Sequence, residues 1–291
     1  MFVQQIINGL TLGMTYALIA VGYSLVFGIL RLVNFSHGAV YAFGANAILF
    51  GIGLQFGLWP AIIIGILATG ILGVLVDKVA LEPLRKKKAA GITSLITTIG
   101  VSSIITNLLI AQLGSQKRSF PSVFPEGAIS FGTYSITYTQ IGMLLVSLIL
   151  LLGLMVLVNK TKIGLAMRAC EQNIRAAQLM GINTNFIISF TFFLGGISAA
   201  IAGTLVSGYY SMAYPNMGYM AGLKAFAAAV LGGIGSLPGS LLGGLVVGVS
   251  ESIAATFLGS EFRDSMAFII LIIVLIIRPN GFFGKKKIKK V

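Results

Sequence analysis

The sequence has little charge and few of the residues that carry most enzyme chemistry. Charged side chains make up 9% of its 291 residues, whereas a soluble domain carries about 25%. Histidine, cysteine and tryptophan occur once each. This scarcity of charge argues against a soluble domain, because a chain this apolar needs an apolar solvent around it.

The rarity of histidine and cysteine limits the possible chemistry further. Cys170 is the single cysteine, so no intrachain disulfide can form. His37 is the single histidine and has no carboxylate near it in sequence, which argues against a serine–histidine–acid triad. The motifs GxxxxGK[ST] and HExxH and any cysteine–histidine cluster are absent. We therefore predict no catalytic residue, no metal site and no cofactor bound by this chain, ATP included.

Acidic residues are scarce inside the apolar runs. Carriers driven by an ion gradient often place carboxylates within their spans. Asp77 lies at the end of a predicted span beside Lys78, and Glu251 is the one carboxylate well inside a span. A single buried carboxylate gives a proton relay little support.

The basic residues do not predict a nucleic-acid partner, although the net charge is +13. No basic stretch interleaves with aromatic residues, and the lysines and arginines form short runs between apolar segments. This distribution is typical of membrane topology signals.

Long apolar runs dominate what is present. A transmembrane helix needs about 20 apolar residues. The runs predict an all-α, polytopic transmembrane helix bundle that forms a single domain over residues 1–291, with eight to nine membrane segments. The run at 223–235 is short and glycine-rich, so we expect a half-helix or a re-entrant piece there. The first run is expected to stay as a helix, because no basic residue precedes Arg31 as in a signal peptide. The runs lie at 6–30, 38–54, 58–79, 93–113, 140–158, 186–208, 223–235, 238–258 and 264–278.

Three basic clusters predict the orientation. They lie at Arg85–Lys88, Lys160–Arg175 and Lys285–Lys290, with an even number of predicted spans between each pair. All three therefore fall on one side, which the positive-inside rule makes cytoplasmic. The N-terminus is then outside, residues 114–139 form the main external loop with a small hairpin in ISFGTYSITY, and the basic tail 279–291 is a cytoplasmic topology signal and lipid anchor.

Glycine is abundant, with 37 residues. Small residues four apart let membrane helices approach closely, and three such pairs are Gly9–Gly13, Gly53–Gly57 and Gly244–Gly248. We favour packing within the chain over a dimer contact. Glu251 lies one turn beyond Gly248 and should face protein or water, either as a pathway or gate residue or as a structural carboxylate.

Two segments interrupt the apolar runs. The first is RLVNFSHGA (Arg31–Ala39), and the second is the glycine-rich LGGIGSLPGSLLGG (Leu231–Gly244). Interrupted helices in two parts of a chain indicate a transport pathway, although each could be an ordinary cytoplasmic turn. In the first interruption, Asn34 and Ser36 are candidate N-caps of the helix that follows. The candidate pathway residues are Asn34, Ser36, His37, Gly38 and Glu251, and the helix-breaking glycines of the second interruption are Gly232, Gly233, Gly235 and Gly239.

The stretch RACEQNIRAAQLMGIN, Arg168–Asn183, is polar between two apolar runs. As one helix over Cys170–Gly181, it has a polar arc that would face outward, with Leu179 alone among the polar residues. The opposite, alanine-rich arc would rest on the bundle and consists of Cys170, Asn173, Ile174, Ala176, Ala177, Met180 and Gly181. Glu171 and Arg175 are spaced to pair, and Gly181 suits a helix stop. We predict docking into a partner rather than an amphipathic helix on the membrane, which would have bulkier apolar residues and more lysines. The candidate docking residues are Glu171, Gln172, Asn173, Arg175, Gln178, Leu179 and Gly181.

Together these motifs resemble the permease subunits of branched-chain amino acid ABC importers, specifically the H-type subunit. The resemblance extends over nearly the whole chain, and three segments carry it. They are NGLTLGMTYALIAVGYSLVFGILRLVNFSHGA (Asn8–Ala39), RACEQNIRAAQLMGI (Arg168–Ile182) and AVLGGIGSLPGSLLGGLVVGVSE (Ala229–Glu251).

The resemblance implies a type II ABC importer-like permease in the inner membrane of a bacterium. It implies a heterodimer with an M-type permease, two cytoplasmic ATPase subunits that hold ATP and Mg, and an extracytoplasmic substrate-binding protein. Residues 168–182 would be the cytoplasmic coupling helix. The substrate would be leucine, isoleucine, valine or a relative, although similar permeases carry urea or short amides. The residues alone leave three alternatives to an ABC importer permease. They are an ion-coupled secondary carrier, a channel-like facilitator and an assembly scaffold.

Overall fold

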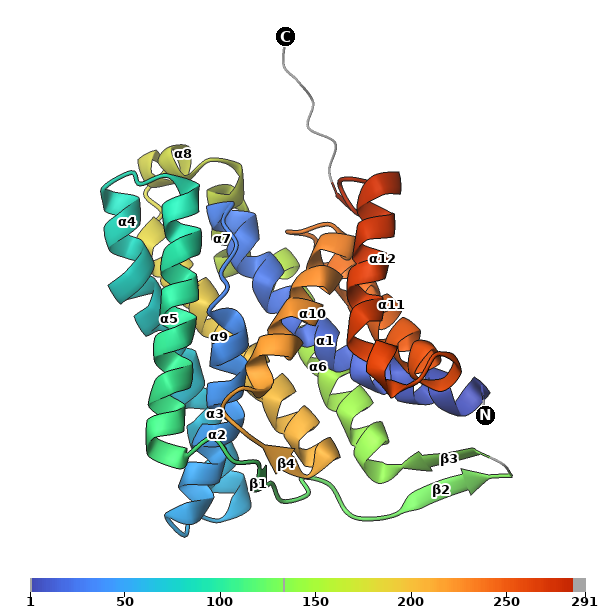
Figure 1. Ribbon diagram of the computed structural model, residues 1–291. Helices are drawn as coiled ribbons and strands as arrows, with labels where there is room; N and C mark the ends of the chain where they lie inside the picture. Colours follow the sequence, from blue (N-terminus) through green and yellow to red (C-terminus); the bar gives the residue numbers. More distant parts are fainter. Residues whose placement is uncertain (1, 133, 285–291) are drawn as a thin grey trace.

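The computed structural model describes residues 2–132 and 134–284 and is a helix bundle with two small two-stranded sheets at one end (Figure 1). The predicted helical class is confirmed. The long helices are α1 (Phe2–Leu30), α3 (Leu58–Leu75), α5 (Gly91–Leu113), α6 (Tyr138–Lys160), α9 (Thr184–Tyr210) and α11 (Leu237–Phe257). The shorter ones are α2 (His37–Gly53), α4 (Glu82–Lys86), α7 (Lys162–Gln172), α8 (Ile174–Leu179), α10 (Met217–Gly232) and α12 (Arg263–Ile277), with a π-helical turn at Val76–Leu81 and a 3₁₀ turn at Ser260–Phe262.

Six helical segments of the described chain are long and apolar enough to cross a membrane, with α3 counted through α4 as Leu58–Lys86. The helices α2, α10 and α12 have 17, 16 and 15 residues, which is about 23–26 Å at the α-helical rise. These three are shorter than a hydrocarbon core of about 30 Å. The predicted count of eight to nine segments is therefore not confirmed. The helix predicted at 223–235 begins earlier, at Met217.

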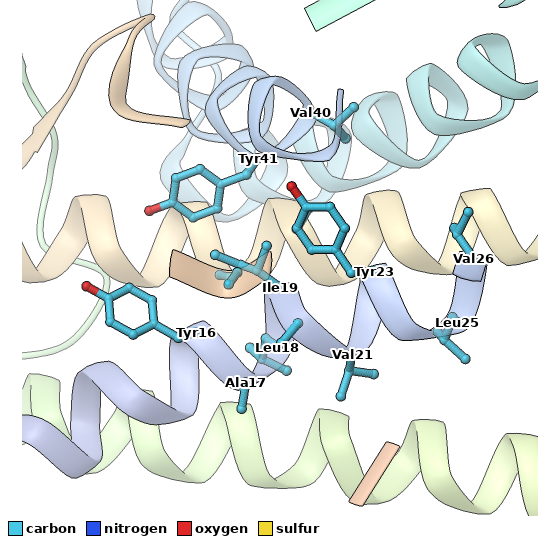
Figure 2. Packing of buried hydrophobic residues seen from close by; sticks show 14 of the residues in the cluster. Tyr16, Ala17, Leu18, Ile19, Val21, Tyr23, Leu25, Val26, Val40 and Tyr41 are labelled. Carbon is cyan, nitrogen blue, oxygen red and sulfur yellow. The ribbon is translucent and has the colours of Figure 1, made fainter. Parts of the chain in front are cut away.

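The first helix is the centre of the bundle. In α1, 89% of the apolar window is buried, against 22% in α5 and α6. Tyr16 and Tyr23 project to the side of α1 where Tyr41 of α2 lies, whereas Ala17 and Val21 project to the other side (Figure 2). The helices α5 and α6 consequently supply the apolar periphery that a bilayer or a partner would cover.

Two of the predicted glycine pairs pack against each other. Gly9 and Gly13 of α1 lie on Gly244 and Gly248 of α11. A Cβ added at Gly13 would be 2.9 Å from the Gly244 carbonyl oxygen, so the two backbones touch. The prediction of intramolecular packing is confirmed here. It is wrong for Gly53–Gly57, because Gly57 precedes α3 and Gly53 has no neighbour within 4 Å of an added Cβ.

Replacing Gly244 by alanine is expected to lower the free energy of unfolding by about 1–3 kcal/mol, the usual cost of overpacking a dense interior. The new Cβ would lie 2.5 Å from the amide nitrogen and 2.6 Å from the Cα of Ala17, and backbone cannot move aside. The matched control is Gly153→Ala in α6, where an added Cβ meets nothing within 4 Å. Thermal unfolding in detergent should show a lower midpoint for the first variant alone, and equal midpoints would contradict the crossing.

The predicted hairpin is present. Strand β2 (Ala128–Phe131) pairs antiparallel with β3 (Tyr134–Thr137), and β1 (Arg118–Ser119) pairs with β4 (Met212–Ala213). The amide nitrogen of Ser135 donates to the Gln4 side chain at 3.0 Å, which holds the start of α1 at the hairpin end. Thr137 and Gln140 then form a capping box that starts α6.

The first two predicted basic clusters lie at the opposite end of the bundle, where Figure 1 shows α4 and α8. Arg85 and Lys86 share one cavity there with Ile174 of α8. Arg168 shares a second cavity with Pro279 and Asn280 from the chain end. The orientation prediction requires the basic clusters to lie at one end of the bundle. The first two clusters and the start of the tail do so. The lysines predicted as the third cluster, 285–290, lie outside the described residues.

Candidate functional site

The connector between α6 and α9, residues 161–183, consists of two short helices rather than the single one predicted. Asn173 separates α7 from α8 with an extended backbone. Its side-chain oxygen accepts from the amide nitrogens of Arg175 and Ala176 at 3.0 and 3.1 Å. An asparagine in this position caps a new helix, so Glu171 and Arg175 do not share one helical face as their spacing suggested.

The end of α8 follows the prediction. Gly181 has φ +81°, its amide donates to the Gln178 carbonyl at 3.0 Å, and the Ile182 amide donates to the Ala177 carbonyl at 3.1 Å. These two bonds form a Schellman motif, which favours glycine at this position. Gly181 therefore stops the helix and turns the chain toward α9.

The exposed face of the connector differs from the predicted arc. Leu179 is 89% exposed, as expected for a knob that points outward, but Met180 is 82% exposed and does not rest on the bundle. Cys170 and Ala177 do face inward and are buried. The tip of α8 thus presents two adjacent apolar side chains, which we call the α8 knob. Gln172, Asn173, Arg175, Gln178 and Gly181 are also exposed, and Glu171 is half-buried.

Several contacts fix the connector to the bundle. Thr161 caps α7 by accepting from the Gly164 amide at 3.0 Å. The guanidinium of Arg168 donates to the Val158 carbonyl at the end of α6. Gln178 donates to the Thr184 hydroxyl at 2.8 Å, which joins α8 to α9. A rigid mounting of this kind lets a force applied to α8 reach the long helices.

The first polar interruption lies inside the bundle. Asn34, Ser36 and His37 are each less than 5% exposed. Ser36 does not cap α2 as predicted, because its hydroxyl donates to Asn34 Oδ1 at 2.6 Å, and the Ser36 amide donates to the same oxygen at 3.2 Å. The amide of Phe35 donates to Thr98 Oγ1 at 3.2 Å. Helix α2 therefore begins within the protein rather than in bulk water, and its first amide, at His37, donates to the Asn34 carbonyl at 3.3 Å.

His37 fills the space beside α1 at this break. Its ring centre lies 4.8 Å from that of Tyr23, and Gly22 and Gly195 leave room for it. Gly38 lies against α10, where an added Cβ at Gly222 would be 2.9 Å from the Gly38 Cα. Gly38 thus allows α2 and α10 to pack closely, whereas His37 lies between α1 and α9.

The second interruption is a tight turn. Gly233 and Gly235 have φ of +97° and +93°, which strongly favours glycine. Gly232 ends α10 and contacts Gly239 in α11. The amides of Phe282 and Phe283 donate to the carbonyls of Leu231 and Gly232, both at 2.9 Å. Of the two interpretations of these glycines, the structure favours a turn at the basic end.

Glu251 belongs to a buried ion network that the sequence analysis did not find. Its Oε1 lies 2.9 Å from Lys224 Nζ and 2.7 Å from Arg263 Nε, and Lys224 Nζ lies 2.6 Å from Asp264 Oδ1. Lys224 and Glu251 are almost fully buried, and the Lys224 ammonium lies 5.6 Å from the centre of the Tyr16 ring. A lysine within an apolar run needs a carboxylate partner, and that rule could have linked Lys224 with Glu251.

The structure does not bring all predicted pathway residues together. His37 packs on Tyr23, whereas Glu251 belongs to the cluster beside Tyr16. Tyr16 and Tyr23 are seven residues apart, so they lie on one face of α1 about 10 Å from each other. The two groups therefore mark different depths of the bundle. Among the described residues no cluster of three or more potential metal ligands occurs.

The six long apolar helices indicate a multi-pass membrane protein, and the comparisons with known proteins give its class, the transport permeases. A profile of the branched-chain amino acid transport system permease component matches residues 5–275. The chain is 39% identical to the high-affinity branched-chain amino acid transport system permease protein BraD of Pseudomonas aeruginosa, over 100% of this chain and 98% of that protein. It is 38% identical to LivH of Escherichia coli K12, with the same coverage.

The chain therefore belongs to the branched-chain amino acid transport permease family, as its motifs suggested. A solved structure, an inward-facing putative metal-chelate type ABC transporter, has the same fold. Its TM-score is 0.54 at 16% identity, over 94% of this chain and 85% of that one.

Proposed function

We propose that this chain is the transmembrane permease subunit of an ABC importer for branched-chain amino acids. The single observation that carries the proposal is the near full-length match to BraD and LivH, whose names give that activity. The chain lacks a phosphate-binding loop, so separate ATPase subunits supply the work. A second permease subunit and an extracytoplasmic binding protein complete the assembly.

The connector is the part of this chain that meets the ATPases in our proposal. The exposed Leu179 and Met180 fit a groove of the partner, and the bonds of Arg168 and Gln178 transmit its movement to α6 and α9. ATP binding closes the ATPases, the connector moves with them as a rigid body, and the bundle alternates its access. This scheme places the connector and the chain end in the cytoplasm and the start of α1 outside.

The pathway proposal rests on the buried interruption before α2. A zwitterionic amino acid needs partners for both charges in an apolar bundle. The amide of Gly38 can meet its carboxylate as a helix N-terminus does, whereas the His37 amide already donates to the Asn34 carbonyl at 3.3 Å. Glu251 lies at another depth of the bundle and is a separate pathway or gate candidate, although its ion pairs also give it a structural role.

Reconstitution into liposomes tests the proposed function. The chain, its partner permease, the ATPases and the binding protein should take up leucine only when all are present and ATP is supplied. Uptake by this chain alone, driven by an ion gradient and indifferent to ATP, would instead identify a secondary carrier. Uptake of urea or a short amide without leucine would keep the importer class and change the substrate.

A further inference from the structure

A basic cavity lies between the α4–α5 turn and the connector. It has a volume of about 550 Å³ and is lined by the end of α1, the turn itself, α8 and the start of α9. Four of its lining residues are cationic, namely Arg31, Arg85, Lys86 and Lys88, and none is acidic. A cavity with this charge fits an anionic group.

The ion pairs of the described chain leave much of this charge unbalanced. Arg85 pairs with the buried Asp77 through Nη1, whereas its Nη2 is buried and has no hydrogen-bond partner. Lys86 Nζ lies 3.0 Å from a Glu82 oxygen. Within residues 2–132 and 134–284, no ion pair involves Arg31 or Lys88. Two cavity-lining cations without an ion-pair partner, beside the guanidinium of Arg85, provide a site for an anion.

The segments on either side of the α4–α5 turn carry exposed apolar side chains. Val79, just before α4, is 74% exposed, and Ile92 and Ile96, in the first turns of α5, are 68% and 62% exposed. In a multi-pass membrane protein such side chains face acyl chains. The combination of a cationic cavity and exposed apolar side chains on the segments that flank its turn matches a molecule that has a phosphate at one end and hydrocarbon at the other. Free phosphate or an acidic peptide would leave these side chains uncovered.

We infer that this basic cavity binds the headgroup of an anionic phospholipid, with its acyl chains along α5 and the π-helical turn that precedes α4. The headgroup phosphate meets the guanidinium of Arg85 and the side chains of Arg31 and Lys88. Ile174 and Gln178 of α8 also line the cavity, so the lipid braces the connector. That last consequence rests on the proposed function, whereas the binding site itself does not.

Native mass spectrometry of the complete chain in detergent tests the site directly. The probes are dioleoyl phosphatidylglycerol and dioleoyl phosphatidylcholine, which share acyl chains and differ in headgroup charge, and inorganic phosphate as a third arm. The test variant is Lys88→Gln. The matched control is Lys87→Gln, which removes the same charge from a neighbour that does not line the cavity. A double variant, Arg31→Gln with Lys88→Gln, extends the series.

We expect the unaltered chain to retain phosphatidylglycerol over phosphatidylcholine. Because each cation near a lipid surface contributes about fivefold to binding, Lys88→Gln should lower retention about fivefold and the double variant about 25-fold, while Lys87→Gln stays near the unaltered chain. Equal losses for Lys87→Gln and Lys88→Gln would overturn the site in favour of diffuse surface charge. Equal retention of the two lipids would overturn the headgroup assignment, and displacement of phosphatidylglycerol by millimolar phosphate would assign the cavity to a free anion.

The thermal midpoint of each variant distinguishes lost binding from lost folding. A Lys88→Gln chain that unfolds at the same temperature as the Lys87→Gln chain and still binds less phosphatidylglycerol supports the site. If Lys88→Gln unfolds early, the Arg31→Gln chain, whose change is at a different element, repeats the comparison. Retention unchanged in Arg31→Gln would then overturn the proposal. None of these outcomes depends on transport, so the site and the proposed function can fail separately.

Discussion

Removing either deep member of the buried ion network is expected to destabilise the protein by up to about 3 kcal/mol, because breaking a buried pair leaves the surviving charge with one partner, Arg263 for Glu251 or Asp264 for Lys224. The variants are Lys224→Met and Glu251→Gln. Each loses an interaction between α10 and α11 whose atoms lie 2.9 Å apart, and the surviving partner stays almost fully buried. Equilibrium unfolding in mixed micelles measures the loss.

The double variant Lys224→Met with Glu251→Gln should cost less than the sum of the two single changes, since no charge of that pair is then left behind. The control is Lys78→Met at the pair Lys78 and Glu82, whose atoms are 2.8 Å apart, because Lys78 is 44% exposed and Glu82, 12% exposed, keeps Lys86 as a partner. Breaking such a surface pair should cost no more than about 1 kcal/mol. Strictly additive losses at Lys224 and Glu251 would contradict a coupled network.

The second large effect is expected at the α8 knob. Leu179→Asp places a charge where the proposed groove of the ATPase is apolar, so the ATPase recovered with a tagged permease should fall by more than tenfold. Loss of one well-packed anchor residue typically costs about 2 kcal/mol or more in an interface, and 1.4 kcal/mol is a factor of ten. Arg175→Glu tests the polar part of the same surface.

The control for the knob is Ile129→Asp in the hairpin at the opposite end of the bundle. Ile129 is 38% exposed, so the same change from an apolar to an acidic side chain is made away from the connector. Recovery of the ATPase with this variant should equal that of the unaltered chain. If Leu179→Asp and Arg175→Glu also recover the ATPase normally, the docking face lies elsewhere.

The sequence predicted elements better than it predicted contacts. The apolar runs located the long helices because hydrophobicity and length are local properties. The glycine pairs at Gly9–Gly13 and Gly244–Gly248 were recognisable for the same reason. That these two pairs meet each other could not be predicted, since helix partners are chosen by the tertiary packing of the whole bundle.

The errors at the connector and at the ion network have different causes. Helical periodicity over Cys170–Gly181 masked Asn173, although asparagine is among the best N-cap residues, so the signal for two helices was present. The inward position predicted for Met180 was wrong for the same reason, because it assumed one continuous helix. Lys224 was overlooked because the residues around it are apolar. Its buried partner is Glu251.

The interruption before α2 shows a further limit. The polar residues Asn34 and Ser36 marked a break in the pattern, but a break inside a bundle and a turn outside it look alike in sequence. The difference comes from α1, which extends seven residues past Tyr23 and lets His37 pack beside it. Depth in the bundle is therefore a property of the neighbouring helices rather than of the interruption itself.

The sidedness of the connector is the central claim, and cysteine labelling tests it most directly. Burial raises the pKa of the Cys170 thiol, and the side chain is 1% exposed, so the native cysteine should react slowly and leave a low background. Leu179→Cys is the reporter, and Ser130→Cys in the hairpin is the control. In intact cells a membrane-impermeant maleimide should label Ser130→Cys and spare Leu179→Cys, and inverted membranes should reverse the result. Labelling of Leu179→Cys from outside intact cells would contradict the account.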